Sequence, residues 1–265
     1  MTTVALRLAY QGAAFDSYAR QPGRRTVEGA LVAALGREGL VAGTFRTGSR
    51  TDAGVSALEN VCRAELDRPH LRGLVPAVQK LLPAGLWLTA AAVAPSFDPR
   101  RAAWRQYRYV APAGGEDLDA MRKAAQEFVG THAMHAFARV EAGRNPERTV
   151  LECSVAPADR FFAFTVRGES FLWNQVRRMV SAILAVGRAE AKVEDIERAF
   201  AAGRPHPRFG VAPAEGLLLE RVHYEGLLWD AQAGGIDVRR VMPDFVQATI
   251  ALAVAQHVAG TSPTG

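Results

Sequence analysis

A polar, glycine-flanked segment from Gly48 to Ala57 holds the residues of this sequence whose types could do chemistry. It reads Gly-Ser-Arg-Thr-Asp-Ala-Gly-Val-Ser-Ala and separates two apolar segments. A carboxylate such as Asp52 can act as a nucleophile or a general base, and Arg50 beside it can bind an anion. Thr51–Gly54 is equally a turn sequence in which an Asp bonds its own backbone, which is the more common use of such residues. Residue types alone leave both interpretations open.

Two further clusters carry polar groups. Arg100, Arg101, Arg105 and Arg108 surround Tyr107, and this spacing is compatible with a solvated face or with phosphate contacts. His132 and His135 are three residues apart without a third ligand in range, so no metal site is predicted.

The composition is that of an ordinary folded protein with a basic excess. The chain has 265 residues, of which 49% are hydrophobic and 22% are charged, enough for two domains with a real core. Its net charge is +5, and only three of the 32 basic residues are lysines. An arginine-rich chain fits a polyanionic partner, but it also fits a GC-rich genome.

Several classes of protein are excluded by what the sequence lacks. No apolar run is long enough to span a membrane, and no signal peptide is visible, so we expect a cytoplasmic protein. Cys62 and Cys153 form no Cys-x-x-Cys, which argues against a zinc knuckle or a disulfide scaffold. No glycine-rich phosphate-binding motif is present, so we expect no nucleotide cofactor.

Apolar periodicity predicts the elements that must position these residues. Thr26 is expected to cap a helix whose apolar face is Val27, Ala30, Leu31, Ala34 and Leu35. Pro76 must either lie near the first turn of the next helix or kink it. In the first part of the chain, we expect a strand over 4–10, a helix over 27–36, strands over 44–47 and 61–66, a helix over 71–82 and a strand over 86–93.

The second part of the chain repeats this β-α-β-β-α-β order. We expect a strand over 104–110, a helix over 118–129, strands over 149–155 and 161–166, helices over 172–186 and 192–202, a closing strand over 217–224 and a C-terminal helix over 243–258. The predicted fold class is α+β, with two ferredoxin-like (RRM-like) units whose sheets form a central antiparallel platform and an active-site cleft between them. The expected domains are 1–102 and 103–235, with a helical extension over 236–265.

Five motifs follow one another along the chain. They are Tyr10-Gln11-Gly12, the hexapeptide Arg50–Val55, Arg105-Gln106-Tyr107-Arg108-Tyr109, Phe171-Leu172 followed by Gln175–Met179, and Gly216-Leu217-Leu218-Leu219. In this order they resemble the TruA family of tRNA pseudouridine synthases, whose signature the hexapeptide matches, and the resemblance extends from about residue 4 to residue 224. Many bacterial members have His where this chain has Ser56, and Gly54-Val55-Ser56-Ala57 together with Asn60 resembles archaeal and eukaryotic members more closely.

The resemblance implies an isomerase that converts uridine to pseudouridine without a metal or a cofactor. Asp52 matches the family's catalytic aspartate, Arg177 its arginine partner and Tyr107 its active-site tyrosine. Burial disfavours a charged carboxylate, and a guanidinium that stays charged when buried restores it. Without the resemblance, Arg177 would be interpreted as a surface residue of a helix and Tyr107 as a core aromatic.

The resemblance also implies the substrate and its contacts. The expected substrate is tRNA, modified at position 38, 39 or 40 of the anticodon stem-loop, and the family forms homodimers that hold one tRNA across both chains. Arg50 is expected to fill the space of the flipped nucleotide or to grip phosphate, and Leu217 to pack against the tyrosine and the base. The remaining expected substrate contacts are Arg100, Arg105, Arg108 and Ser56.

Two other functions compete with this interpretation. The chain could be an RNA-binding protein of the same fold without turnover, or a base hydrolase that fails to rejoin the uracil. Asp52, Arg177 and Tyr107 together argue against simple binding, because binding needs no carboxylate facing RNA phosphates.

Overall fold

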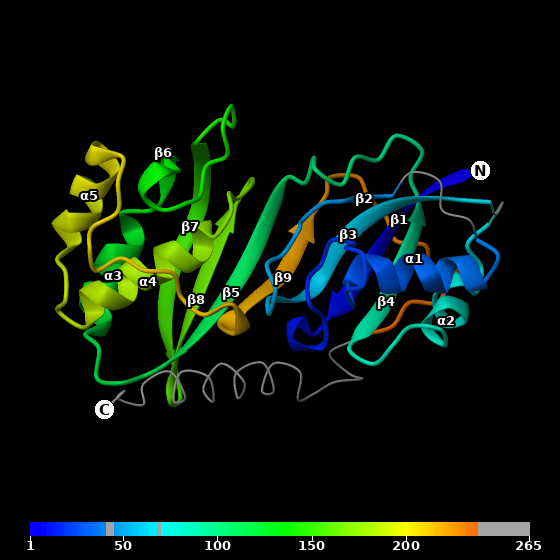
Figure 1. The fold of residues 1–265 in the computed structure, drawn as a ribbon, viewed down its shortest axis with the longest axis horizontal. Helices are drawn as coiled ribbons and strands as arrows, with labels where there is room; N and C mark the ends of the chain where they lie inside the picture. The colour runs from blue at the N-terminus through cyan, green and yellow to red at the C-terminus, as the bar shows by residue number, and fades with distance from the viewer. Residues whose placement is uncertain (41–44, 68–69, 238–265) are drawn as a thin grey trace. The chain divides into compact units, whose positions relative to one another are not determined.

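The computed structural model describes residues 1–40, 45–67 and 70–237, and the elements of this part of the chain are shown in Figure 1. The fold is α+β with mostly antiparallel strands, as the sequence predicts. The described residues divide into two compact units. Unit 1 contains residues 1–103 and 218–237, and unit 2 contains residues 104–217.

Unit 1 is built on a sheet in which β1 lies between β4 and β3. β2 pairs with one end of β3, and β9 pairs with the other end. The element order β-α-β-β-α-β predicted for this part is confirmed. The elements are β1 (Thr2–Tyr10), α1 (Val27–Arg37), β2 (Arg46–Thr47), β3 (Ser56–Leu66), α2 (Leu74–Gln79), β4 (Leu86–Val93) and β9 (Leu217–His223).

The pairing of β9 with β3 is the topological feature that periodicity does not predict. β9 runs parallel to β3, with Ser56 opposite Leu218 and Ala57 opposite Leu219. β3 also begins at Ser56, earlier than the expected Val61. The apolar alternation that signals a strand is interrupted at Ser56 and Asn60, so the pattern conceals the start of β3. This early start places the strand directly after the Asp52 loop.

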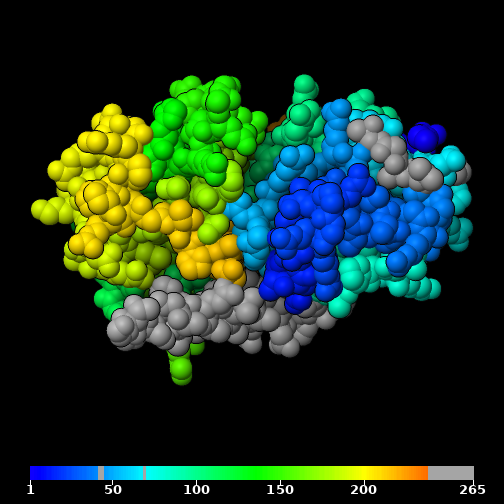
Figure 2. Space-filling model, viewed as in Figure 1, coloured from blue at the N-terminus to red at the C-terminus, as the bar shows by residue number. Residues whose placement is uncertain are grey.

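The core of unit 1 forms between its sheet and its two helices. Leu6 and Leu8 of β1, Leu31 and Leu35 of α1 and Val78 of α2 are all 0% exposed. Thr26 caps α1 as expected, because its hydroxyl accepts a hydrogen bond from the Gly29 N–H. Figure 1 shows α1 in front of the strands of unit 1, and in Figure 2 blue atoms from the N-terminal part of the chain form much of this face. This packing fixes the strands that carry the polar loop.

Unit 2 has a four-stranded antiparallel sheet in the order β5-β8-β7-β6. The helices of unit 2 lie together on one side of these strands (Figure 1). Met121, Phe164, Met179 and Ile183 are fully buried there. The elements are β5 (Trp104–Pro112), α3 (Leu118–Gln126), β6 (Gly130–Ala133), β7 (Glu147–Ala158), β8 (Phe161–Gly168), α4 (Gln175–Gly187) and α5 (Val193–Ala202).

Several boundaries differ from the sequence prediction for local reasons. α2 is shorter than expected, although Pro76 lies in its first turn as predicted. α4 begins at Gln175 rather than at Leu172, because Asn174 adopts a left-handed conformation with φ 61°. Strand β6 was not predicted, since the Gly130–Ala133 segment carries no alternating apolar pattern. The helix expected over 243–258 lies outside the described residues.

No helix in the described part of the chain combines the length and the apolar character that crossing a bilayer requires.

Candidate active site

A buried polar network holds the loop that contains Asp52. Asn60, 0% exposed on β3, donates its side-chain amide to the Tyr10 hydroxyl at 3.0 Å and to the Ser49 carbonyl at 2.9 Å. The Tyr10 hydroxyl also forms a hydrogen bond of 2.9 Å with the Thr51 hydroxyl. The loop is therefore tied to β1 and β3 on the N-terminal side of Asp52 by two buried side chains, those of Tyr10 and Asn60.

On the other side of Asp52, the loop packs closely against the end of β1. A Cβ atom at Gly12 would overlap the carbonyl group of Gly54, so only glycine allows this approach. The Gly12 N–H donates to the Ser56 hydroxyl at 3.0 Å, and Ser56 is 5% exposed. Ser56 thus supports the loop, and its expected contact with RNA stays a prediction.

Asp52 itself is the first residue of a turn. The Val55 N–H donates to the Asp52 carbonyl at 3.2 Å, and Gly54 adopts a φ of 84°. Asp52 is half-buried, and Arg50 is exposed. The turn interpretation is therefore correct for the backbone. The Asp52 side chain in this turn is partly accessible to solvent.

Arg100 lies in a turn that contacts the start of this loop. Its guanidinium binds the Asp98 carboxylate through two hydrogen bonds, of 3.1 and 3.2 Å, which lower the pKa of Asp98. The Tyr224 hydroxyl donates to the Pro99 carbonyl, and Gly48 packs against both groups. Unit 1 thus brings Arg50, Asp52, Ser56 and the Arg100 turn into one region.

In unit 2, the segment from Phe171 to Arg177 brings the predicted residues together. Tyr107, 9% exposed on β5, meets the Phe171 ring edge-on with 5.3 Å between ring centroids. The buried Arg105 donates to the Glu169 carbonyl just before this segment. Arg108, on the same strand, is half-buried.

Arg177 is held in one orientation by its neighbours. Its Nε donates to the Ala212 carbonyl at 2.6 Å, and its Nη1 donates to the Asn174 Oδ1 at 3.0 Å. The side chain is half-buried, so Arg177 is not a fully exposed residue of its helix. A guanidinium anchored on two sides is preorganised to meet an anion.

Leu217 lies close to this region of unit 2. It is 6% exposed and follows Gly216, whose Cα packs against the Tyr109 ring. Burial raises the pKa of Tyr109 above its ordinary value, and the positive charge of Arg177 partly opposes this. Leu217 is therefore a core residue, and its expected contact with a base stays a prediction.

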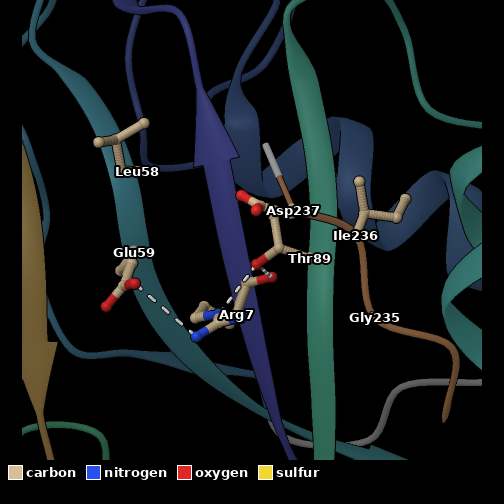
Figure 3. A pocket seen from close by; sticks show the side chains of 7 residues that line it. All are labelled: Arg7, Leu58, Glu59, Thr89, Gly235, Ile236 and Asp237. Atoms are coloured by element: carbon tan, nitrogen blue, oxygen red, sulfur yellow. Dashed lines mark hydrogen bonds and ion pairs between the residues drawn. The ribbon is translucent and has the colours of Figure 1, made fainter. Parts of the chain in front are cut away.

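A separate cavity of about 260 Å³ lies in unit 1 and is shown in Figure 3. Arg7 is its central charged group, donating to the Thr89 hydroxyl at 3.1 Å and lying 3.8 Å from the Glu59 carboxylate. The Arg7 guanidinium thus has a hydrogen-bond acceptor and an anionic partner within the cavity. The lining includes none of the predicted site residues. The lining residues are Arg7, Leu58, Glu59, Thr89, Gly235, Ile236 and Asp237.

Comparison with known proteins places the chain as a whole in one family. The profile of the tRNA pseudouridine synthases matches residues 124–225. The tRNA pseudouridine synthase A of Thermococcus kodakarensis is 38% identical over 244 residues, covering 89% of this chain and 90% of the relative. The chain belongs to the tRNA pseudouridine synthase family. The enzyme of the same name from Methanoculleus marisnigri is 41% identical, covering 83% of this chain and 82% of the relative.

Membership of the tRNA pseudouridine synthase family makes the chain an isomerase and confirms the resemblance to archaeal members. Tyr10 and Asn60 are supports of the site to which the sequence prediction gave no role. The available signal was Asn60 itself, a polar residue at an inward position of an otherwise apolar strand.

Asn60→Ala is expected to destabilise this pseudouridine synthase by about 2 kcal/mol, because the Ser49 carbonyl and the Tyr10 hydroxyl lose a buried donor. Urea denaturation measures the free energy of unfolding. Asn145→Ala is the matched control, since Asn145 is exposed and its side chain binds only a neighbouring backbone N–H. An equal effect of the two variants would contradict a supporting role for Asn60.

Proposed function

We propose that this chain converts uridine to pseudouridine in tRNA, at position 38, 39 or 40 of the anticodon stem-loop. The observation that supports this most is the 38% identity over 89% of the chain with a tRNA pseudouridine synthase A. The loop that holds Asp52 in place supports it independently, because a half-buried carboxylate on a rigid loop suits a catalytic group better than a surface one.

The reaction breaks the N1–C1′ bond of uridine and forms a C5–C1′ bond. The uracil turns between the two steps, C5 gives up its proton and N1 gains one, so the product is an isomer of the substrate. We assign to Asp52 the carboxylate that promotes cleavage of the glycosidic bond. Arg177 stabilises that carboxylate, and Tyr107 stacks on the flipped uracil and assists removal of the C5 proton.

The remaining assignments concern binding. Moving the target uridine out of the base stack costs a few kcal/mol of free energy. Arg50 offsets this cost by filling the space that the uridine leaves or by binding a phosphate. Arg100 and Arg108 contact phosphates, and Leu217 packs beside the base. Arg105 is buried against the Glu169 carbonyl, and its expected phosphate contact stays a prediction.

We further propose that the enzyme acts in the cytoplasm and that it forms a homodimer. Native mass spectrometry measures the oligomeric state directly.

The experiment is a pseudouridine map of an unmodified tRNA transcript after incubation with the enzyme. We expect pseudouridine at position 38, 39 or 40 wherever the transcript has uridine there, and none in a matched transcript with cytidine at these positions. The map reads every uridine of the transcript by chemical labelling and primer extension.

The other results of this experiment each contradict the proposal. Tight binding of several tRNAs without any pseudouridine would indicate an RNA-binding protein without turnover. Release of free uracil with an abasic site would indicate a base hydrolase. Pseudouridine found only outside the anticodon arm would support the proposed reaction but contradict the assigned positions.

A further inference from the structure

Trp173 is an exposed aromatic side chain at the edge of the unit 2 residues described above. It is 47% exposed, and the other three tryptophans of the chain are only partly exposed. It lies between Phe171, which meets the Tyr107 ring, and Asn174, which anchors the Arg177 guanidinium. An indole in this position is exposed beside the groups to which we assign catalysis.

Arg139 is stacked on this indole. Its guanidinium carbon lies 4.3 Å from the Trp173 ring centroid. Two other Arg–Trp pairs are wider: Arg167 over Trp104 at 5.6 Å and Arg7 over Trp229 at 5.1 Å. Those arginines also contact carboxylates, Arg167 with Glu152 and Arg7 with Glu59. Within the described ranges, no carboxylate forms an ion pair with Arg139.

The backbone under the pair is held by hydrogen bonds on both sides of Trp173. The Arg139 N–H donates to the Trp173 carbonyl at 2.9 Å, which joins two segments far apart in the sequence. The preceding Leu172 is buried, and its N–H donates to the side chain of the buried Gln175. The indole is therefore presented on a fixed support, which lowers the entropy lost when a partner stacks on it.

We propose that Arg139 and Trp173, here called the Arg139–Trp173 platform, bind an unpaired nucleotide of the tRNA next to the reacting uridine. The base stacks on the indole, and the guanidinium contacts a phosphate. An unneutralised cation on an exposed indole matches a nucleotide, which offers an aromatic face and a negative charge together. This inference rests on the proposed function for its choice of tRNA as the occupant.

The test compares the binding and turnover of platform variants with the full-length enzyme and unmodified tRNA. Trp173→Ala is expected to raise the Kd for tRNA about 5- to 50-fold, with kcat at saturating tRNA reduced less than about threefold. Trp173→Phe keeps an aromatic face and is expected to retain most of the affinity. Arg139→Ala is expected to lower the slope of log Kd against log salt by about one.

Tryptophan fluorescence gives a readout that a purely structural role would not move. Binding of tRNA is expected to quench the wild-type emission, and this quenching shrinks in Trp173→Phe while binding persists. Leu151→Ala and Arg122→Ala are matched controls, because both residues are exposed in unit 2 and neither belongs to the site. Thermal melting checks that every variant is folded.

The outcomes separate this inference from the proposed function. Unchanged affinity and unchanged quenching in the Trp173 variants, with normal pseudouridine formation by the wild type, overturn the platform alone. Weakened binding in Trp173→Ala, with no pseudouridine formed by the wild type, supports the platform and overturns the proposed function. A change of native mass in Trp173→Ala without a change in tRNA affinity marks a protein interface and overturns the platform.

Discussion

Asp52→Asn is expected to reduce pseudouridine formation by about 1,000-fold or more while the Kd for tRNA stays within about threefold of the wild type. The amide has the size of the carboxylate but lacks its charge, so it can neither attack the sugar nor promote loss of the base. The measurement is single-turnover conversion of tRNA at saturating enzyme, together with a binding isotherm under the same conditions.

This substitution leaves the backbone hydrogen bond of the Asp52 turn in place. The turn at Asp52 depends on a hydrogen bond from the Val55 N–H to the Asp52 carbonyl, which Asn leaves intact. Asn also favours the same kind of turn as Asp. A loss of turnover therefore reports the chemistry of the side chain and not the folding of the loop.

Asp119→Asn is the matched control for this prediction. Asp119 lies in the first turn of α3 and is exposed, with only an exposed ion pair to Arg122, so its replacement is expected to leave turnover unchanged. If Asp52→Asn retained wild-type activity, the assignment of Asp52 as the catalytic carboxylate would be wrong.

Arg177→Ala is expected to lower kcat by about 100-fold or more and to raise KM for tRNA less than about fivefold. We propose that Arg177 stabilises the Asp52 carboxylate, and removing one partner of such a charge pair typically costs about 2–5 kcal/mol, which we expect to fall on the step in which Asp52 reacts. Arg177→Lys is expected to recover about tenfold of the loss, since it restores the charge without the planar fork. Steady-state kinetics with tRNA separates the two constants.

Two further variants make the Arg177 result specific. Asn174→Gly keeps the left-handed backbone but removes the hydrogen bond to the Arg177 Nη1, so we expect a smaller loss of kcat, about 3- to 10-fold. Arg198→Ala removes an exposed arginine of α5 and is expected to change neither constant. Equal losses of kcat and of tRNA affinity in Arg177→Ala would assign Arg177 to binding rather than to catalysis.

Much of the fold could be predicted because hydrophobic periodicity and helix-capping residues are local features of the sequence. The strand Leu86–Val93 was predicted with its correct bounds, and Thr26 caps α1 as expected. Boundaries failed where a backbone conformation overrode the pattern, as at Asn174, which delays the start of α4. A left-handed residue leaves no mark on hydrophobic periodicity, so no sequence pattern predicted this boundary.

Sequence motifs suggest which residues form the candidate site, and those assignments stay predictions, whereas the groups that support these residues leave no sequence pattern. Asp52 and Arg177 come from motifs whose order and residue types mark the family. The hydrogen bonds that hold them come from Asn60, Tyr10, Ala212 and Asn174, which are distant in sequence or act through backbone atoms. A carbonyl such as that of Ala212 is available at every position of a chain, so its use cannot be read from residue types.

By itself, the sequence determined the α+β class, the family and the residues that we assign to the reaction, because these depend on residue types and their spacing. The tertiary structure decided how those residues are supported: β3 begins at Ser56 and pairs in parallel with β9, and Arg177 is anchored by Ala212. It also decided that Trp173 is exposed beneath an arginine more than thirty residues away in the chain. Such contacts depend on which surfaces meet after folding, and a pattern along one chain does not encode them locally.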